Sequence, residues 1–145
     1  MGRRKTVFFS CLILSFAFLT SSCTEVQPQV KTVKLLDGQA VPDLRGTWKV
    51  DYEYYGIYRA LTGYCNMVTI FQEENKFTAV VNASDQVVAM GTEAIRGELS
   101  RNGFNAVQIF TKDKGWLDCE GVISGNGDQI VLVEKTQKRT LTRKR

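Results

Sequence analysis

Apolar and polar residues alternate along most of the chain from residue 44 onward. In 47–55, for example, Trp48 and Val50 fall on one face, and Lys49 and Asp51 fall on the other. A period of two residues is typical of a β-strand with one buried face. The pattern recurs in segments of similar length and predicts eight strands, at 47–55, 64–72, 76–82, 92–100, 104–111, 116–124, 130–135 and 138–143.

Tight turns separate these segments. The strongest turn signal is Asn102-Gly103, because both residues tolerate the positive φ that a two-residue hairpin turn needs. Short strands at regular spacing are typical of a barrel or a sandwich. Closure into a barrel removes the two unpaired edges of an antiparallel meander. We therefore predict an all-β fold, a small eight-stranded antiparallel up-and-down barrel without a substantial helix; 57–61 has room for one or two turns at most.

The N-terminal segment has the pattern of a secretory signal. Arg3, Arg4 and Lys5 precede an apolar run, 6–19, and small residues lead to Cys23. The run of 14 residues is shorter than the ~20 that a membrane-spanning helix needs. These features predict a cleaved signal peptide over 1–22, a tether over 23–43 and the barrel domain over 44–145. Within the tether, a short strand or clip around Val33 is one option.

The end of this signal, Leu-Thr-Ser-Ser-Cys, resembles the lipobox of bacterial lipoproteins. The resemblance implies that cleavage makes Cys23 the first residue and that this cysteine carries lipid, including palmitate. The lipid would then anchor the protein to a membrane. Thr24 after the cysteine implies sorting to the outer membrane of a bacterial cell envelope. An ordinary cleaved signal with an incidental Cys23 is the alternative.

Charge and cysteine content follow from this export. The formal charge is +4, but removal of the three basic residues of the signal leaves 16 basic and 15 acidic side chains. A nearly neutral domain has no basic face for nucleic acid, so none is expected as a partner. Cys65 and Cys119 are an even pair in an exported protein, which predicts a disulfide. Two separate buried thiols are the alternative.

The start of the first strand adds a motif. Gly46-Thr47-Trp48 opening an eight-stranded meander resembles the calycin superfamily, which includes the lipocalins. The resemblance implies a lipocalin-like barrel whose floor is closed by Trp48, with an arginine of the last strand, Arg139 or Arg143, over the indole. The domain of about 100 residues is shorter than most lipocalins and lacks their helix. The layout also resembles small secreted metalloprotease inhibitors, which are eight-stranded barrels.

Catalytic chemistry finds little support. The chain contains no histidine, which excludes a Ser-His-Asp triad and removes the commonest general base and metal ligand. Two cysteines alone do not make a structural zinc site, which has four ligands. No glycine-rich phosphate loop is present. We therefore expect no enzyme, no metal and no cofactor.

Tyrosines crowd the first strand and the connection that follows it. Tyrosine joins apolar area to a hydroxyl, which suits a binding surface. Tyr52, Tyr54 and Tyr58 are the candidate ligand-binding residues, together with Glu93 on the face of Ile95. Core packing is the alternative for the tyrosines, and a loop position is the alternative for Glu93.

Two functions remain after these exclusions. The first is non-catalytic binding of a small apolar or amphipathic ligand inside the barrel. The second is a protein-interaction or inhibitor module with a solid core, which acts on an envelope protein through its surface. A cavity of ~300 Å3 or more favours the first function, and a filled core with an exposed aromatic patch favours the second.

Overall fold

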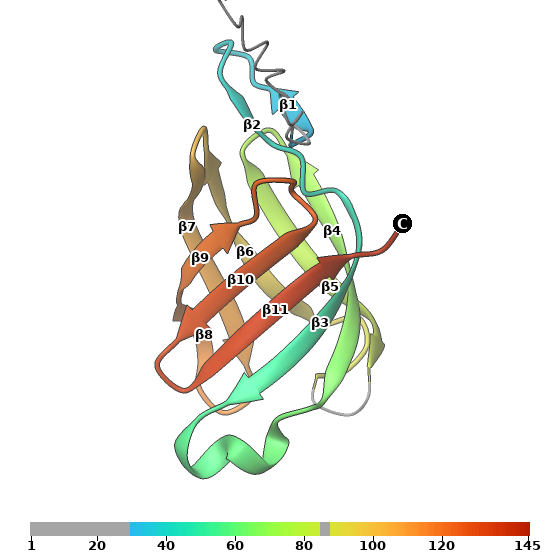
Figure 1. The fold of residues 1–145 in the computed structure, drawn as a ribbon, viewed down its shortest axis with the longest axis vertical. Helices are drawn as coiled ribbons and strands as arrows, with labels where there is room; N and C mark the ends of the chain where they lie inside the picture. Colours follow the sequence, from blue (N-terminus) through green and yellow to red (C-terminus); the bar gives the residue numbers. More distant parts are fainter. Residues whose placement is uncertain (1–29, 85–87) are drawn as a thin grey trace, which may run out of the picture.

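A single antiparallel sheet curls into a nearly closed barrel (Figure 1). The computed structural model describes residues 30–84 and 88–145. Nine strands follow one another around the sheet in the order β8-β7-β6-β5-β4-β3-β11-β10-β9. They are β3 (Gly46–Tyr54), β4 (Cys65–Glu73), β5 (Lys76–Ser84), β6 (Glu93–Ser100), β7 (Gly103–Thr111), β8 (Gly115–Asp118), β9 (Glu120–Ile123), β10 (Gln129–Glu134) and β11 (Gln137–Arg143).

The all-β prediction is confirmed, and the strand count differs by one for a simple reason. Only Cys119 separates β8 from β9, where the sequence predicted one continuous strand. β8 pairs with β7, whereas β9 pairs with β10. The Cys119 N–H donates to the Val107 carbonyl at 3.1 Å, so the chain crosses from one neighbour to the other there. In the described residues the only helical element is the 3-10 segment η1 (Gly56–Leu61).

Inward-facing apolar side chains fill the barrel. Strand alternation places them on one face, and the opposite face carries most of the charged residues. Eighteen buried hydrophobic residues form one cluster: Val41, Leu44, Trp48, Val50, Tyr52, Val68, Ile70, Phe77, Ala79, Val81, Ala94, Ile95, Leu99, Val107, Ile109, Ile130, Leu132 and Leu141. The barrel is therefore largely a packed core, as small eight-stranded barrels often are.

Trp48 closes one end of the barrel and is fully buried. Its indole N–H donates to the Leu44 carbonyl at 2.9 Å, and the Arg143 guanidinium lies 4.4 Å from the ring centroid. Arg143 also donates to the Asp43 carbonyl at 2.6 Å and to the Arg45 carbonyl at 2.7 Å. The arginine over the indole is thus Arg143, and it ties the last strand to the entry of the first.

Part of the segment predicted as a tether is folded. β1 (Thr32–Lys34) and β2 (Ala40–Pro42) form a two-stranded hairpin at the Trp48 end of the barrel (Figure 1). Val41 of this hairpin is fully buried, and Val33 packs partly buried against the core. Of the options for this segment, the short strand around Val33 is the one that the structure contains, and it covers this end.

The structure does not contain the predicted disulfide, since Cys65 and Cys119 are not bonded to each other. On β4 the buried side chains begin at Asn66 and continue at every second residue, so Cys65 faces the outside of the barrel. Cys119 packs against the core on the inside. The barrel wall lies between the two thiols. The prediction rested on an even cysteine count, which carries no information about which face each strand presents.

Replacement of the two tryptophans tests this arrangement. Trp48→Ala removes a fully buried side chain and the platform under Arg143, so we expect a loss of about 3–5 kcal/mol in the free energy of unfolding. Trp116 is half-buried on the outer face beside Arg96, whose guanidinium lies 4.1 Å from its ring, and Trp116→Ala should cost clearly less. Urea titration gives both values. A larger loss for Trp116→Ala would contradict the assignment of faces.

Alkylation tests the placement of the cysteines. Burial raises the pKa of the Cys119 thiol to about 11, so at pH 8 this thiol is protonated and reacts slowly. Cys65, on the outer face, should be carboxamidomethylated by iodoacetamide much faster. Peptide mass mapping without reductant resolves each position, and urea-unfolded protein is the control in which both sites react. A linked Cys65–Cys119 peptide would show that the bridge exists.

Candidate functional site

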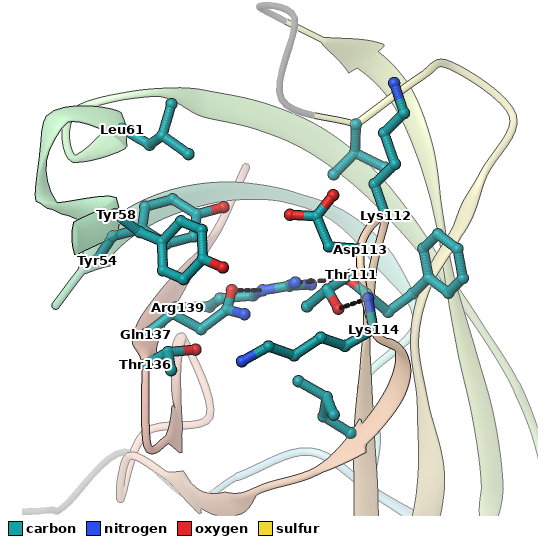
Figure 2. Close-up of a pocket in the computed structure, with 13 residues that line it drawn as sticks. Tyr54, Tyr58, Leu61, Thr111, Lys112, Asp113, Lys114, Thr136, Gln137 and Arg139 are labelled. Carbon is teal, nitrogen blue, oxygen red and sulfur yellow. Dashed lines mark hydrogen bonds between the residues drawn. The ribbon is translucent and has the colours of Figure 1, made fainter. Parts of the chain in front are cut away.

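A pocket of about 200 Å3 opens at the end of the barrel opposite Trp48. It lies between η1, the β7–β8 turn and the β10–β11 turn (Figure 2). We call it the mouth pocket. Its lining consists of Tyr54, Tyr58, Leu61, Val88, Phe110, Thr111, Lys112, Asp113, Lys114, Leu117, Thr136, Gln137 and Arg139.

The η1 segment forms one wall of the mouth pocket. None of its residues is buried, so η1 is held mainly by backbone and side-chain hydrogen bonds at its ends. The Tyr54 N–H donates to Thr62 Oγ1 at 2.9 Å, and the Gly63 N–H donates to the Tyr52 carbonyl at 3.1 Å. Gly56 and Gly63 both have positive φ, which lets the chain turn sharply at each end of the segment. Tyr58 and Leu61 consequently face the pocket, as Figure 2 shows.

Arg139 lies at the inner end of the mouth pocket and is 1% exposed. Its Nε–H donates to Gln137 Oε1 at 3.0 Å, Nη1 donates to the Ala94 carbonyl at 3.1 Å, and Nη2 donates to the Phe110 carbonyl at 2.7 Å. Arg139 thus spans the interior from β11 to β6 and β7. Burial lowers the pKa of its guanidinium, while the phenols of Tyr52 and Tyr54 act in the opposite direction. An arginine nevertheless stays protonated in a protein.

A polar layer lies beside Arg139 within the barrel. The guanidinium lies 5.1 Å from the Tyr52 ring centroid, and the Tyr52 and Tyr54 rings stack at 5.9 Å with an interplanar angle of 7°. Asn66 Nδ2 donates to the Tyr52 hydroxyl at 2.7 Å. The other amide atom, Asn66 Oδ1, is buried without a hydrogen-bond partner in the part of the chain that the structure describes. The interior is therefore polar at the mouth end and apolar toward Trp48.

The rim of the mouth pocket is basic. Lys112 and Lys114 on the β7–β8 turn join Arg139 in the lining, against one carboxylate, Asp113. Lys114 Nζ lies 5.9 Å from the Tyr58 ring centroid, across the pocket. Burial raises the pKa of nearby Glu134, but hydrogen bonds from the Thr136 N–H and hydroxyl outweigh it and leave this pKa lowered. Glu134 thereby holds the β10–β11 turn in place.

The predicted ligand-binding residues have separate fates. Tyr54 and Tyr58 line the mouth pocket, whereas Tyr52 is buried beneath it and belongs to the core. Glu93 is exposed and does not line the pocket, so the structure does not bring it together with the tyrosines. The cause is a β-bulge: Ala79 pairs with Ile95 and Val80 pairs with Glu93, which leaves Ala94 as an extra residue. Ala94 and Ile95 are both buried, and Glu93 turns outward.

The prediction for Arg139 also needs correction. Strand alternation placed Arg139 and Arg143 on the same inner face, and either one could have covered Trp48. The register pairs Arg143 with Trp48 and Arg139 with Tyr52. Arg139 therefore lies four residues nearer the mouth along β11. Arg139 therefore belongs to the mouth pocket rather than to the closed end.

Several lining residues were not predicted from the sequence. The segment from Lys112 to Lys114 was assigned only as a turn, and nothing in its composition places it opposite η1. Gln137 is buried at the start of β11, a position for which the sequence analysis gave no expectation. The one signal that the sequence offered was a cluster of charged residues in a turn at the same end of the barrel as the tyrosines.

Comparisons with protein-family models, with curated proteins and with solved structures give no match. In the described ranges, 30–84 and 88–145, no helix has the length and apolar character needed to cross a membrane. The same ranges contain no cluster of three or more His, Cys, Asp or Glu side chains suited to a metal ion. The proposals below therefore depend on the geometry of the chain itself.

Proposed function

We propose that this protein is a non-catalytic binding protein that holds a small amphipathic molecule in the mouth pocket. The observation that supports this most is the composition of the lining. Aromatic and aliphatic side chains of η1 and β3 form one side, and polar or charged groups of the β7–β8 turn and β11 form the other (Figure 2). An apolar concavity with a few convergent polar groups is the usual form of a small-molecule site.

The volume limits the ligand. Sites for drug-sized molecules measure about 300–1,000 Å3, and the mouth pocket, at about 200 Å3, is smaller. A cavity of roughly 150 Å3 is nevertheless sufficient for benzene. The packed core leaves the ligand no path toward Trp48. The bound group is therefore a single ring or a short chain, or the end of a longer molecule whose remainder lies outside the barrel.

The lack of histidine and the state of the buried Cys119 thiol support a non-catalytic role. The chain has no histidine, and the buried Cys119 thiol is protonated at neutral pH because burial raises its pKa to about 11. A catalytic cysteine needs the opposite shift, toward the thiolate. Three protein acceptors in the described residues hold the Arg139 guanidinium in one place. A side chain fixed in this way suits a binding site.

A second function, contact with a protein partner, is favoured by one observation. Ile57 on η1 and Met90 on the β5–β6 connection are 89% and 73% exposed. Exposed apolar side chains of this size are common at interaction surfaces. Ile57 lies on the η1 segment that lines the mouth pocket, and Met90 lies two residues after Val88 of the same lining, so a partner there would cover the pocket as well.

Lipid attachment at Cys23 remains part of the proposal and has a geometric consequence. Residues 1–29, including the signal segment and Cys23, lie outside the described residues. Six residues separate Cys23 from Val30, a span of about 25 Å at most when fully extended. Val30 packs near Gly127 at the Trp48 end of the barrel. An anchored domain would therefore direct its closed end to the outer membrane and its mouth away from it.

Charge insertion into the mouth pocket tests ligand binding. Leu61→Asp should weaken binding of the neutral probe phenylacetamide at least about fivefold, because the variant loses roughly 1 kcal/mol of apolar contact. Ile57→Asp, on the same segment but outside the lining, is the matched control and should bind as the unmodified protein does. Chemical-shift titration by 1H–15N NMR measures both. Shifts that miss the lining residues, or equal effects of the two variants, would contradict the proposal.

Replacement of the lipidated residue tests the anchor. Cys23→Ser should prevent lipid attachment, so the protein should leave the membrane fraction or accumulate as an uncleaved precursor. Intact-mass measurement and fractionation of bacterial cells that express the full chain distinguish these states from the lipidated form. Cys65→Ser, which leaves the N-terminal segment unchanged, is the control. Unchanged mass and membrane association in Cys23→Ser would refute the lipoprotein hypothesis.

A further inference from the structure

The Arg139 guanidinium is a buried positive charge without a carboxylate partner in the described residues. The ion pairs there join Arg45 and Arg143 to Asp43 and Asp128, and other surface lysines and arginines to acidic neighbours, but none includes Arg139. Burial of a charge is costly unless the charge is paired. Arg139 therefore places a positive charge without an ion-pair partner in the described residues beside an open pocket.

The hydrogen bonds of Arg139 leave donors available. Its three bonds use one N–H on each guanidinium nitrogen, and their acceptors, Gln137 Oε1 and two main-chain carbonyls, are all neutral. A guanidinium has five N–H donors. Within the described residues, one N–H on Nη1 and one on Nη2 are therefore left for a further acceptor. These bonds also fix the plane of the guanidinium, so little conformational entropy is lost when an additional acceptor binds.

The acidic side chains near the mouth do not neutralise this charge. Asp113 lines the pocket but is exposed on the turn. Burial lowers the pKa of the Arg139 guanidinium, and the Glu134 charge acts in the opposite direction. Glu134 nevertheless forms no ion pair with Arg139 in the described residues, and its carboxylate accepts two hydrogen bonds from Thr136 at 2.9 and 2.6 Å. Lys112 and Lys114 add positive charge at the rim. The described lining thus has three basic groups and one acidic group, and the most deeply buried of the four is a cation.

From this geometry we propose that the mouth pocket is specific for a small organic carboxylate, whose anionic group is bound by Arg139. The inference rests on the proposed binding function and adds the chemical class of the ligand. The apolar part of the ligand packs against Tyr54, Tyr58 and Leu61, which face Arg139 across the pocket (Figure 2). A carboxylate matches the planar fork of a guanidinium and is compact enough for about 200 Å3 to hold an attached ring as well.

A pair of isosteric probes isolates the charge. Phenylacetate and phenylacetamide have the same shape and the same number of non-hydrogen atoms, and at pH 7 only the first is an anion. NMR titration of the unmodified protein should give dissociation constants around millimolar for such fragments. Phenylacetate should bind about tenfold more tightly, since a charge-assisted hydrogen bond is roughly twice as strong as a neutral one.

The NMR signals of the arginine Nε–H groups report where the anion binds. On saturation with phenylacetate, the Nε–H signal of Arg139 should shift, whereas that of Arg143 at the closed end should not. Arg139→Lys removes the first signal and so assigns it without removing the charge. This measurement uses the unmodified protein and does not require a neutral variant of Arg139 to fold.

A variant of the rim separates Arg139 from the surface lysines. In Lys112→Gln/Lys114→Gln, overall affinity for phenylacetate should fall modestly, about two- to threefold, and the preference over phenylacetamide should persist. Disappearance of the preference in this variant would place the anion at the rim and overturn the inference.

The remaining outcomes separate this inference from the proposed function. Equal affinity for the two probes, or pocket shifts without a shift of the Arg139 Nε–H signal, would overturn the carboxylate assignment and leave the binding function intact. A lack of pocket shifts with both probes would contradict the binding function itself.

Discussion

Closure of the barrel at Cys119 is the constraint on which the other features depend. The chain pairs with β7 through β8 and with β10 through β9, and only Cys119 separates the two pairings. The two ends of the sheet thus meet at this residue. β9 packs closely against β7 where the barrel closes, and β6 lies directly beside β7 in the sheet. A Cβ at Gly121 would lie 2.5 Å from the Phe104 ring, and a Cβ at Gly97 would lie 2.3 Å from the Ala106 carbonyl. At Gly97 the clash is with main-chain atoms, so a larger residue would displace the neighbouring strand, whereas at Gly121 it would displace the Phe104 ring.

Each end of the barrel contains one inward arginine of β11, but the two arginines have different surroundings. Arg143 and Arg139 project inward from the same strand, four residues apart. Arg143 lies over Trp48, bonds to the carbonyls of the entering chain and forms an ion pair with Asp128, so its charge is compensated. Arg139 bonds only to neutral acceptors and faces the mouth pocket. One end is thereby sealed by packing, and the other retains an unbalanced charge.

The bulge in β6 connects the fold to this pocket. An extra residue at Ala94 changes the phase of the strand, so that Ala94 and Ile95 are both buried, and the Ala94 carbonyl accepts the Arg139 Nη1–H. The same change turns Glu93 outward. An inward Glu93 would have added a second carboxylate to the mouth, whereas the described lining contains only that of Asp113. Bulges near functional sites often redirect side chains in this way.

Local periodicity determined much of this protein. The two-residue period specified the strands, the turns between them and the inward face of Trp48, because alternation depends only on neighbouring residues. The pairing of Arg143 rather than Arg139 with Trp48, the outward positions of Cys65 and Glu93 and the meeting of Tyr58 with Lys114 were decided only by the tertiary structure. Each of these depends on strand register, on a bulge or on the closure of the barrel, which join residues far apart in the chain and leave no local pattern.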